Sequence, residues 1–96
     1  MKQPAVYIVA SRKNGTIYTG VTSNLIQRIA QHRDDTTGGF TAKYGVKSLV
    51  WLEIHGTMEA AILREKQIKA GSRAAKVRLI METNPDWLDL YDGLLT

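Results

Sequence analysis

The chain has 96 residues, of which 44% are hydrophobic and 23% charged, so it can form one small globular domain but not two. It contains no cysteine, which excludes disulfides, thiolate metal sites and a cysteine nucleophile. The net charge of +4 is unevenly distributed, because residues 81–96 hold four acidic residues and no lysine or arginine, which leaves +8 on residues 1–80. A basic body of this kind attracts polyanions such as nucleic acids, although a solvated basic surface has the same composition. With no signal-peptide pattern and no apolar run long enough to span a membrane, we expect a cytoplasmic protein.

The chain begins with a pattern typical of a β-hairpin. Residues 5–11 and 16–22 are rich in β-branched and aromatic residues, and Asn14-Gly15 between them is a strong hairpin signal. A two-residue turn at Asn14-Gly15 pairs Tyr7 with Thr22. Side chains alternate between the two faces of a strand, so we expect the buried face to be the one that holds Val6, Ile8, Ala10, Ile17, Thr19 and Val21.

The rest of the chain alternates helical and strand patterns with clear caps and breaks. The predicted elements are a helix at about 24–34 capped by Ser23 or Asn24, a helical turn at 40–44, a strand at 47–55, helices at 58–70 and 72–83, and a short helix at 86–91 that docks Trp87 and Leu88. The order ββα(α)βααα predicts an α/β fold of the α+β type, with a small three-stranded sheet flanked by helices. We expect one domain over residues 1–96, with a docking segment at about 84–96.

Polar side chains gather near the predicted junction of sheet and helix. Tyr7, Tyr18 and Gly20 share one face of the hairpin, and a strand glycine leaves room for another backbone or a ligand. Arg28 and His32 are four residues apart and therefore lie on the same side of their helix. The same pattern also fits two half-buried tyrosines and a solvated Arg/His pair.

Glu65 is unusual because it falls within the apolar stripe of its predicted helix, which is formed by Met58, Ala61, Ile62 and Ile68. A carboxylate turned toward an interior is costly unless a cation or hydrogen-bond donors satisfy it. The partner of Glu65 is therefore either a lysine or arginine, such as Arg64 or a hairpin base, or a metal ion.

A run of six basic residues between Arg64 and Arg78 suits a groove that binds a phosphate backbone, since such contacts need positive charge and reach. The candidate nucleic-acid-binding residues are Arg12, Lys13, Lys43, Arg64, Lys66, Lys69 and Arg73.

Together these motifs resemble the GIY-YIG nuclease superfamily, and specifically its small single-domain bacterial members related to the N-terminal nuclease region of the UvrABC excinuclease. The first motif matches Ala5-Val6-Tyr7 and the second matches Tyr18-Thr19-Gly20, and the likeness spans about residues 5–78. Two positions depart from the usual motifs, because Ala5 stands for glycine and Thr19 for isoleucine. The resemblance places the family's helix arginine at Arg28, its following histidine at His32 and its metal-binding glutamate at Glu65.

The resemblance implies an endonuclease that hydrolyses DNA with Mg²⁺, for which Mn²⁺ can substitute, and with selectivity for DNA structure over sequence. Glu65 would hold the ion, since Mg²⁺ accepts one carboxylate plus waters and phosphate oxygens, and Arg28 would neutralise charge on the phosphoryl group. Either Tyr7, supported by Tyr18, or His32 would take the proton of the attacking water. The first option needs neighbouring cations to lower the pKa of Tyr7. The alternative is a catalytically inactive module that binds nucleic acid or a partner.

Overall fold

The protein forms a three-stranded antiparallel sheet with the strand order β2-β1-β3. The structure is a computed structural model that describes residues 3–34 and 39–95, without the side chains of residues 40 and 41. Its elements are, in chain order, β1 (Ala5–Ala10), β2 (Ile17–Thr22), α1 (Leu25–Arg33), α2 (Gly39–Tyr44), β3 (Ser48–Ile54), α3 (Met58–Ala70), α4 (Arg73–Thr83) and α5 (Tyr91–Leu94). This confirms the predicted order of elements. No helix in the described ranges is long and apolar enough to cross a membrane.

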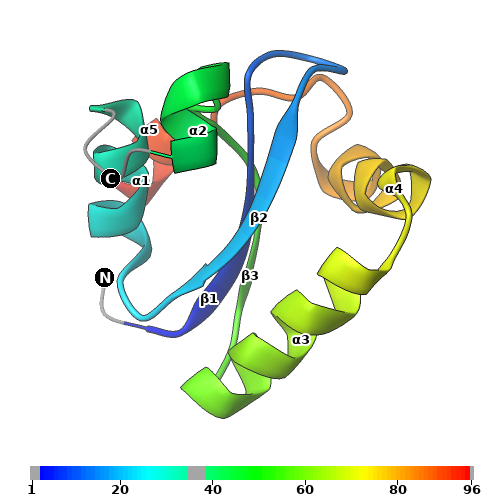
Figure 1. Ribbon diagram of the computed structural model, residues 1–96. Helices are drawn as coiled ribbons and strands as arrows, with labels where there is room; N and C mark the ends of the chain where they lie inside the picture. The colour runs from blue at the N-terminus through cyan, green and yellow to red at the C-terminus, as the bar shows by residue number, and fades with distance from the viewer. Residues whose placement is uncertain (1–2, 35–38, 96) are drawn as a thin grey trace.

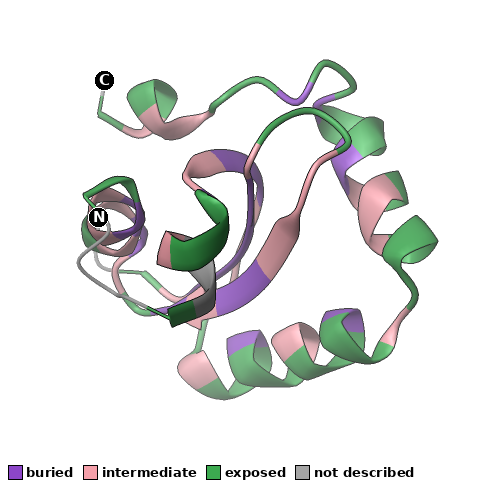
Figure 2. Cartoon of the chain, turned by 45° about the horizontal axis from the view of Figure 1, so that its top comes forward, coloured by how far each residue is buried: buried purple, intermediate pink, exposed green. Residues whose placement is uncertain are grey.

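Helices cover both faces of the sheet. Figure 1 shows α1, α2 and α5 on one side and α3 and α4 on the other, with the strands between them. Every residue of the central strand β1 is buried, as the purple strand in Figure 2 illustrates. The core on the α3 and α4 side includes Val6, Ile8, Ala10, Ile68 and Ile80. The core on the α1 and α5 side includes Tyr7, Val9, Leu25, Ile29 and Leu49.

The expectation of a single buried face was therefore wrong. Alternation along β1 assigned the residues to the correct two faces, but it could not show that the face of Tyr7 is also covered. That cover comes from α1 and from the C-terminal segment, where the Leu90 amide donates to the Leu49 carbonyl of β3 at 2.8 Å. Tyr7 has no exposed surface as a result.

Helices α1, α3 and α4 begin at side-chain caps, and two of these caps position the helices that carry the candidate site. Asn24 accepts from the Gln27 amide at the start of α1, and Thr57 accepts from the Ala60 amide at the start of α3. Each cap satisfies an amide that has no partner within its own helix.

The hairpin register differs by two residues from the predicted one. Tyr7 lies opposite Gly20, where a two-residue turn had placed Thr22. The connection is longer because the Ser11 amide donates to the Thr16 carbonyl at 2.9 Å, which leaves Arg12 to Gly15 as a four-residue loop. A shift of two keeps the alternation of side chains, so Tyr7 and Gly20 still share a face.

The pairing of Tyr7 with Gly20 predicts a large effect of adding one methyl group. A Cβ atom on Gly20 would lie 2.5 Å from Cζ of Tyr7, which is shorter than the van der Waals contact distance. The Tyr7 ring is buried on all sides and has little room to move away. We expect Gly20→Ala to lower the free energy of unfolding by about 1–3 kcal/mol, as overpacking of cores does. Urea denaturation measures this loss. Gly56→Ala is the matched control, because a Cβ atom there meets no atom within 4 Å, and an equal effect in both variants would contradict the argument.

The C-terminal segment was predicted less well. A helix was expected at 86–91, but α5 begins only at Tyr91. The side chain of Asn84 instead bonds the Val50 carbonyl and both backbone groups of Leu88, and Trp87 adopts a positive φ of 56°, which stops helix formation. Trp87 is buried as expected, whereas Leu88 is 62% exposed.

Candidate active site

A hydrogen bond joins the phenol of the first motif to the histidine of α1. The Tyr7 hydroxyl lies 2.9 Å from Nε2 of His32, and both side chains are buried. The Tyr18 ring lies near His32, with the two ring centroids 6.0 Å apart. The second ring nitrogen of His32, Nδ1, is buried without a hydrogen-bond partner among the described residues. The structure therefore brings Tyr7, Tyr18 and His32 together between β1, β2 and α1.

Burial determines the protonation of this pair. It raises the pKa of Tyr7 to about 12, and the nearby charge and hydrogen bond of Arg28 offset only part of that rise. The condition for an ionised Tyr7, a pKa brought below its usual value by neighbouring cations, is therefore not met, because Arg28 lowers the pKa by less than burial raises it. Burial, and secondly the charge of Arg28, lower the pKa of His32. At neutral pH Tyr7 is protonated and His32 neutral, and the hydroxyl donates to Nε2 in the tautomer of His32 that carries its proton on Nδ1.

The lowered pKa of His32 predicts an acid-sensitive contribution to stability. The unfolded chain binds a proton at His32 at a higher pH than the folded protein does. The neutral, buried His32 therefore contributes to stability above pH 6.5, and this contribution to the free energy of unfolding is lost as the pH falls below 6.5. We expect the free energy of unfolding to fall more steeply from pH 7.5 to pH 5 in the wild type than in His32→Gln. Urea denaturation at a series of pH values tests this, and parallel curves for the two proteins would refute it.

Glu65 projects from α3 into the same region. It lies in the buried stripe with Ala61 and Ile68, its side chain is 15% exposed, and its charge contributes to the raised pKa of Tyr7. Its partner is Lys69, one helical turn later, with Nζ 3.3 Å from Oε2 of Glu65. Arg64, one of the partners considered from the sequence, instead bonds Glu53 of β3 at 3.0 Å.

The five candidate catalytic residues thus lie in one electrostatic neighbourhood around the phenol of Tyr7. Arg28, Tyr18 and Glu65 all act electrostatically on Tyr7, and His32 is hydrogen-bonded to it. They come from β1, β2, α1 and α3 and are separated by up to 58 positions in the sequence. Arg28 and Glu65 bring opposite charges to this region, which suits a substrate that carries a phosphate and a metal ion.

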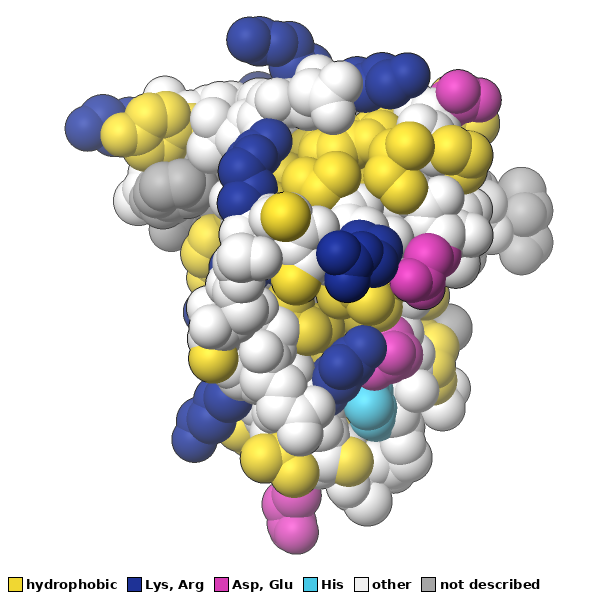
Figure 3. Space-filling view, turned by 90° about the vertical axis from the view of Figure 1, so that its right-hand side faces the viewer, with side chains coloured by type: hydrophobic (Ala, Val, Ile, Leu, Met, Phe, Trp, Pro, Cys, Tyr) yellow, Lys and Arg dark blue, Asp and Glu magenta, His cyan; other side chains and the backbone are white. Residues whose placement is uncertain are grey.

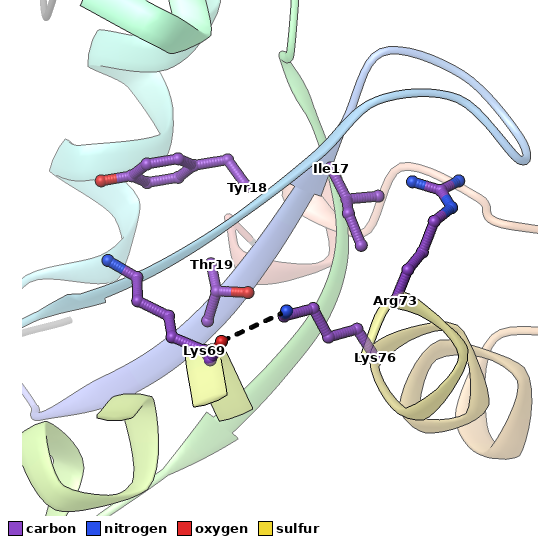
Figure 4. A pocket seen from close by; sticks show the side chains of 6 residues that line it. All are labelled: Ile17, Tyr18, Thr19, Lys69, Arg73 and Lys76. Atoms are coloured by element: carbon purple, nitrogen blue, oxygen red, sulfur yellow. Dashed lines mark hydrogen bonds between the residues drawn. The ribbon is translucent and has the colours of Figure 1, made fainter. Parts of the chain in front are cut away.

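A groove of about 380 Å³ adjoins this cluster between β2 and the α3–α4 corner. Its lining residues are Ile17, Tyr18, Thr19, Lys69, Arg73 and Lys76 (Figure 4). Tyr18 thus belongs to both the cluster and the groove. Three cations over an apolar and aromatic wall suit a phosphate backbone with an adjacent sugar or base.

The predicted nucleic-acid-binding residues are only partly gathered here. Lys69 and Arg73 line the groove, and Arg73 also donates to the carbonyls of Asn14 and Gly15 in the hairpin loop. Lys76 belongs to the basic run that was expected to line a groove, although it was not among the named candidate binding residues; its ammonium bonds the Gly71 carbonyl at 2.9 Å, so α4 directs it back toward the end of α3. The sequence signal for Lys76 was the break at Gly71, which has basic residues on both sides.

The remaining predicted cations lie elsewhere. Arg12 and Lys13 are exposed in the hairpin loop, Lys66 is exposed on α3, and Lys43 of α2 contacts the ring of Tyr44. Figure 3 shows the side of the molecule formed by α3 and α4, where lysine and arginine side chains lie among apolar ones and acidic side chains lie along one edge. A second hollow of about 310 Å³ lies there between the two helices, and Arg64 is among its lining residues.

Glu65 fits a Mg²⁺ or Mn²⁺ site in which the protein supplies a single carboxylate ligand. No group of three His, Cys, Asp or Glu side chains that could enclose a metal ion occurs within residues 3–34 and 39–95. Mg²⁺ does not need such a group, since it keeps several waters and is bound by one or two carboxylates together with substrate phosphates. The ammonium of Lys69 at Oε2 shows that this carboxylate already takes a cationic partner.

Comparison with known proteins agrees with this fold and site. A family model described as the GIY-YIG catalytic domain matches residues 3–78, which include all five clustered residues. The chain belongs to the GIY-YIG family. This confirms the resemblance seen in the motifs, and the family supports nuclease activity on DNA.

The similar proteins are small bacterial and archaeal chains. A UPF0213 protein from Aeromonas salmonicida is 34% identical over 95 residues, covering 98% of this chain and 68% of the relative. Another, from Syntrophus aciditrophicus, is 38% identical over 91 residues, covering 90% and 98%. The solution NMR structure of a UPF0213 protein from Bacillus halodurans matches with a TM-score of 0.53 and 30% identity, over 84% of this chain and 85% of that one.

Proposed function

We propose that the protein is a divalent-metal-dependent endonuclease that hydrolyses DNA phosphodiester bonds and selects DNA structure over sequence. The observation that carries this proposal is the meeting of Tyr18, Arg28 and Glu65 around the Tyr7–His32 pair, beside a groove lined by three cations. Phosphate contacts by lysine and arginine carry no sequence information, which is the reason to expect structure selectivity.

Each residue has a distinct role in this proposal. Glu65 would hold Mg²⁺ or Mn²⁺, which supplies charge stabilisation at the phosphate and the leaving oxygen. Arg28, half-buried on α1, would neutralise the negative charge that develops on the phosphoryl oxygens. Tyr18, which lines the groove, would contact and orient the attacking water.

Tyr7 has no exposed surface, so the Tyr7–His32 pair would receive the proton of that water through a relay, for which the Tyr18 hydroxyl is the candidate. A phenol with a pKa of about 12 is not ionised at neutral pH, so Tyr7 does not act as a free phenolate. Its oxygen can accept a proton as its own proton passes along the 2.9 Å hydrogen bond to Nε2 of His32. Because His32 must be neutral to receive it, cleavage should decline as the pH falls below the lowered pKa of His32.

The direct test incubates the purified protein with supercoiled, branched and single-stranded DNA in the presence of Mg²⁺ or Mn²⁺. We expect cleavage of at least one of these substrates, and we expect EDTA to abolish it. The alternative, an inactive nucleic-acid-binding module, is favoured by the strongly basic body. Salt-sensitive DNA binding with no cleavage of any substrate, and with no dependence on divalent ions, would support that alternative and contradict the proposal.

A further inference from the structure

Lys69 stands between the candidate metal ligand and the groove. Its ammonium lies 3.3 Å from Oε2 of Glu65 and 5.4 Å from the centroid of the Tyr18 ring. Figure 4 shows its side chain extending from the end of α3 toward Tyr18 along β2. One flexible cation therefore touches the carboxylate, the aromatic wall and the groove at once.

An ammonium at this position and a divalent ion bound by Glu65 would compete for the same carboxylate. We propose that Lys69 is a resident counter-ion of Glu65 that leaves it for a phosphate of the nucleic acid, so that nucleic acid and metal ion bind with positive coupling. This inference rests on the proposed function, because it assumes that Glu65 is the metal ligand and that the groove binds a phosphate backbone.

The pair has the properties of a contact that can be exchanged. The side chain of Lys69 is 46% exposed and that of Glu65 only 15%, so the lysine end of the pair is open to solvent and can turn away from the carboxylate. The other two groove cations are held more firmly, because Lys76 bonds the Gly71 carbonyl and Arg73 bonds two carbonyls of the hairpin loop. A phosphate in the groove would therefore draw Lys69 away more easily than it would move Arg73 or Lys76.

Coupling of this kind is reciprocal. If the phosphate removes Lys69 from Glu65, the metal ion binds more tightly when nucleic acid is present, and nucleic acid binds more tightly when the metal ion is present by the same factor. Without the lysine, the carboxylate is open to the ion from the start, so the metal ion should bind more tightly to the free protein and gain less from nucleic acid.

The test titrates Mn²⁺ into the wild type, Lys69→Gln and Lys66→Gln without nucleic acid, and follows binding by the relaxation rate of water protons. Lys66→Gln is the matched control, because it removes the same charge from an exposed position of the same helix. We expect Lys69→Gln to bind Mn²⁺ about two- to five-fold more tightly than the wild type, a factor in the range of a half-exposed ion pair. We expect less than half of that gain in Lys66→Gln.

A second measurement examines the coupling itself. Fluorescence anisotropy with a labelled, phosphorothioate-linked branched DNA should show that Mn²⁺ tightens binding more in the wild type than in Lys69→Gln.

Equal Mn²⁺ affinities for Lys69→Gln and Lys66→Gln, or weaker Mn²⁺ binding by Lys69→Gln, would overturn the inference. Glu65→Gln separates the two proposals: if it abolishes Mn²⁺ binding while the two lysine variants behave alike, only the role of Lys69 fails, whereas unchanged Mn²⁺ binding in Glu65→Gln removes the metal assignment as well.

Discussion

Glu65→Gln should lower the rate of DNA cleavage by on the order of 10³-fold at saturating Mg²⁺, at the upper end of what loss of a major electrostatic stabiliser costs. The neutral amide keeps the size of the side chain but loses the charge that would hold the ion. Folding should be nearly unaffected, because the change removes only the ion pair with Lys69, which is four residues away on the same helix. Gel assays of cleavage, together with urea denaturation, measure both quantities.

Glu59→Gln is the matched control for this prediction, since Glu59 is an exposed carboxylate in the first turn of the same helix. It should cleave DNA at the rate of the wild type. Cleavage that continues undiminished in Glu65→Gln would exclude Glu65 as the metal ligand.

Arg28→Met should lower cleavage on the order of 10²–10³-fold, because it removes the positive charge that α1 would bring to the phosphoryl oxygens. Arg28→Lys should recover only part of the loss, since an ammonium keeps the charge but not the forked geometry of the guanidinium. The Arg28→Met substitution has a second expected effect. Arg28 lowers the pKa of His32, so its removal should move the acid side of the pH–rate profile to higher pH.

Arg12→Met controls for the loss of one positive charge, because Arg12 is exposed in the hairpin loop and lies outside the cluster. It should weaken DNA binding slightly and leave the pH–rate profile in place. An equal fall in cleavage for Arg12→Met and Arg28→Met, with no change in the pH profile of either, would show that Arg28 acts only through overall charge.

The elements of the fold could be predicted because local patterns determine them. Side-chain caps such as Asn24 and Thr57, and the alternation along β1, act within a few residues of sequence. The hairpin register could not be predicted in the same way, because Asn14-Gly15 fits a two-residue turn as well as the longer loop closed by Ser11 and Thr16.

The C-terminal segment depends on tertiary contacts that leave no periodic signal. Asp89 bonds Arg33 of α1 and the Leu49 amide of β3, and Arg33 also lies over the ring of Tyr91. These contacts hold the non-helical segment 84–90 against the sheet and α1, where it helps to bury the face that carries Tyr7. An apolar and acidic sequence without such partners resembles a short helix, which explains why a helix was expected there.

The candidate site, like the fold, could be predicted only in part. The spacing of Arg28 and His32, and the place of Glu65 in an apolar stripe, identified the residues that meet around Tyr7. The direction of the pKa shift of Tyr7 was not predictable, because it is a balance between burial and the charge of Arg28, and the depth of burial depends on α1 and the C-terminal segment. Lys69 was not named as the partner of Glu65, although its place four residues later on the same helix was a local signal for this ion pair.

The proposed nuclease activity requires that Glu65 holds a divalent ion beside the clustered side chains. The most direct test adds Mn²⁺ to ¹⁵N-labelled protein and records which amide signals broaden in two-dimensional NMR spectra. Broadening is expected to centre on Tyr18, Gly20 and Glu65 and to disappear in Glu65→Gln. Broadening that centres on the acidic residues Asp86, Asp89 and Asp92, and that is unchanged in Glu65→Gln, would contradict the claim.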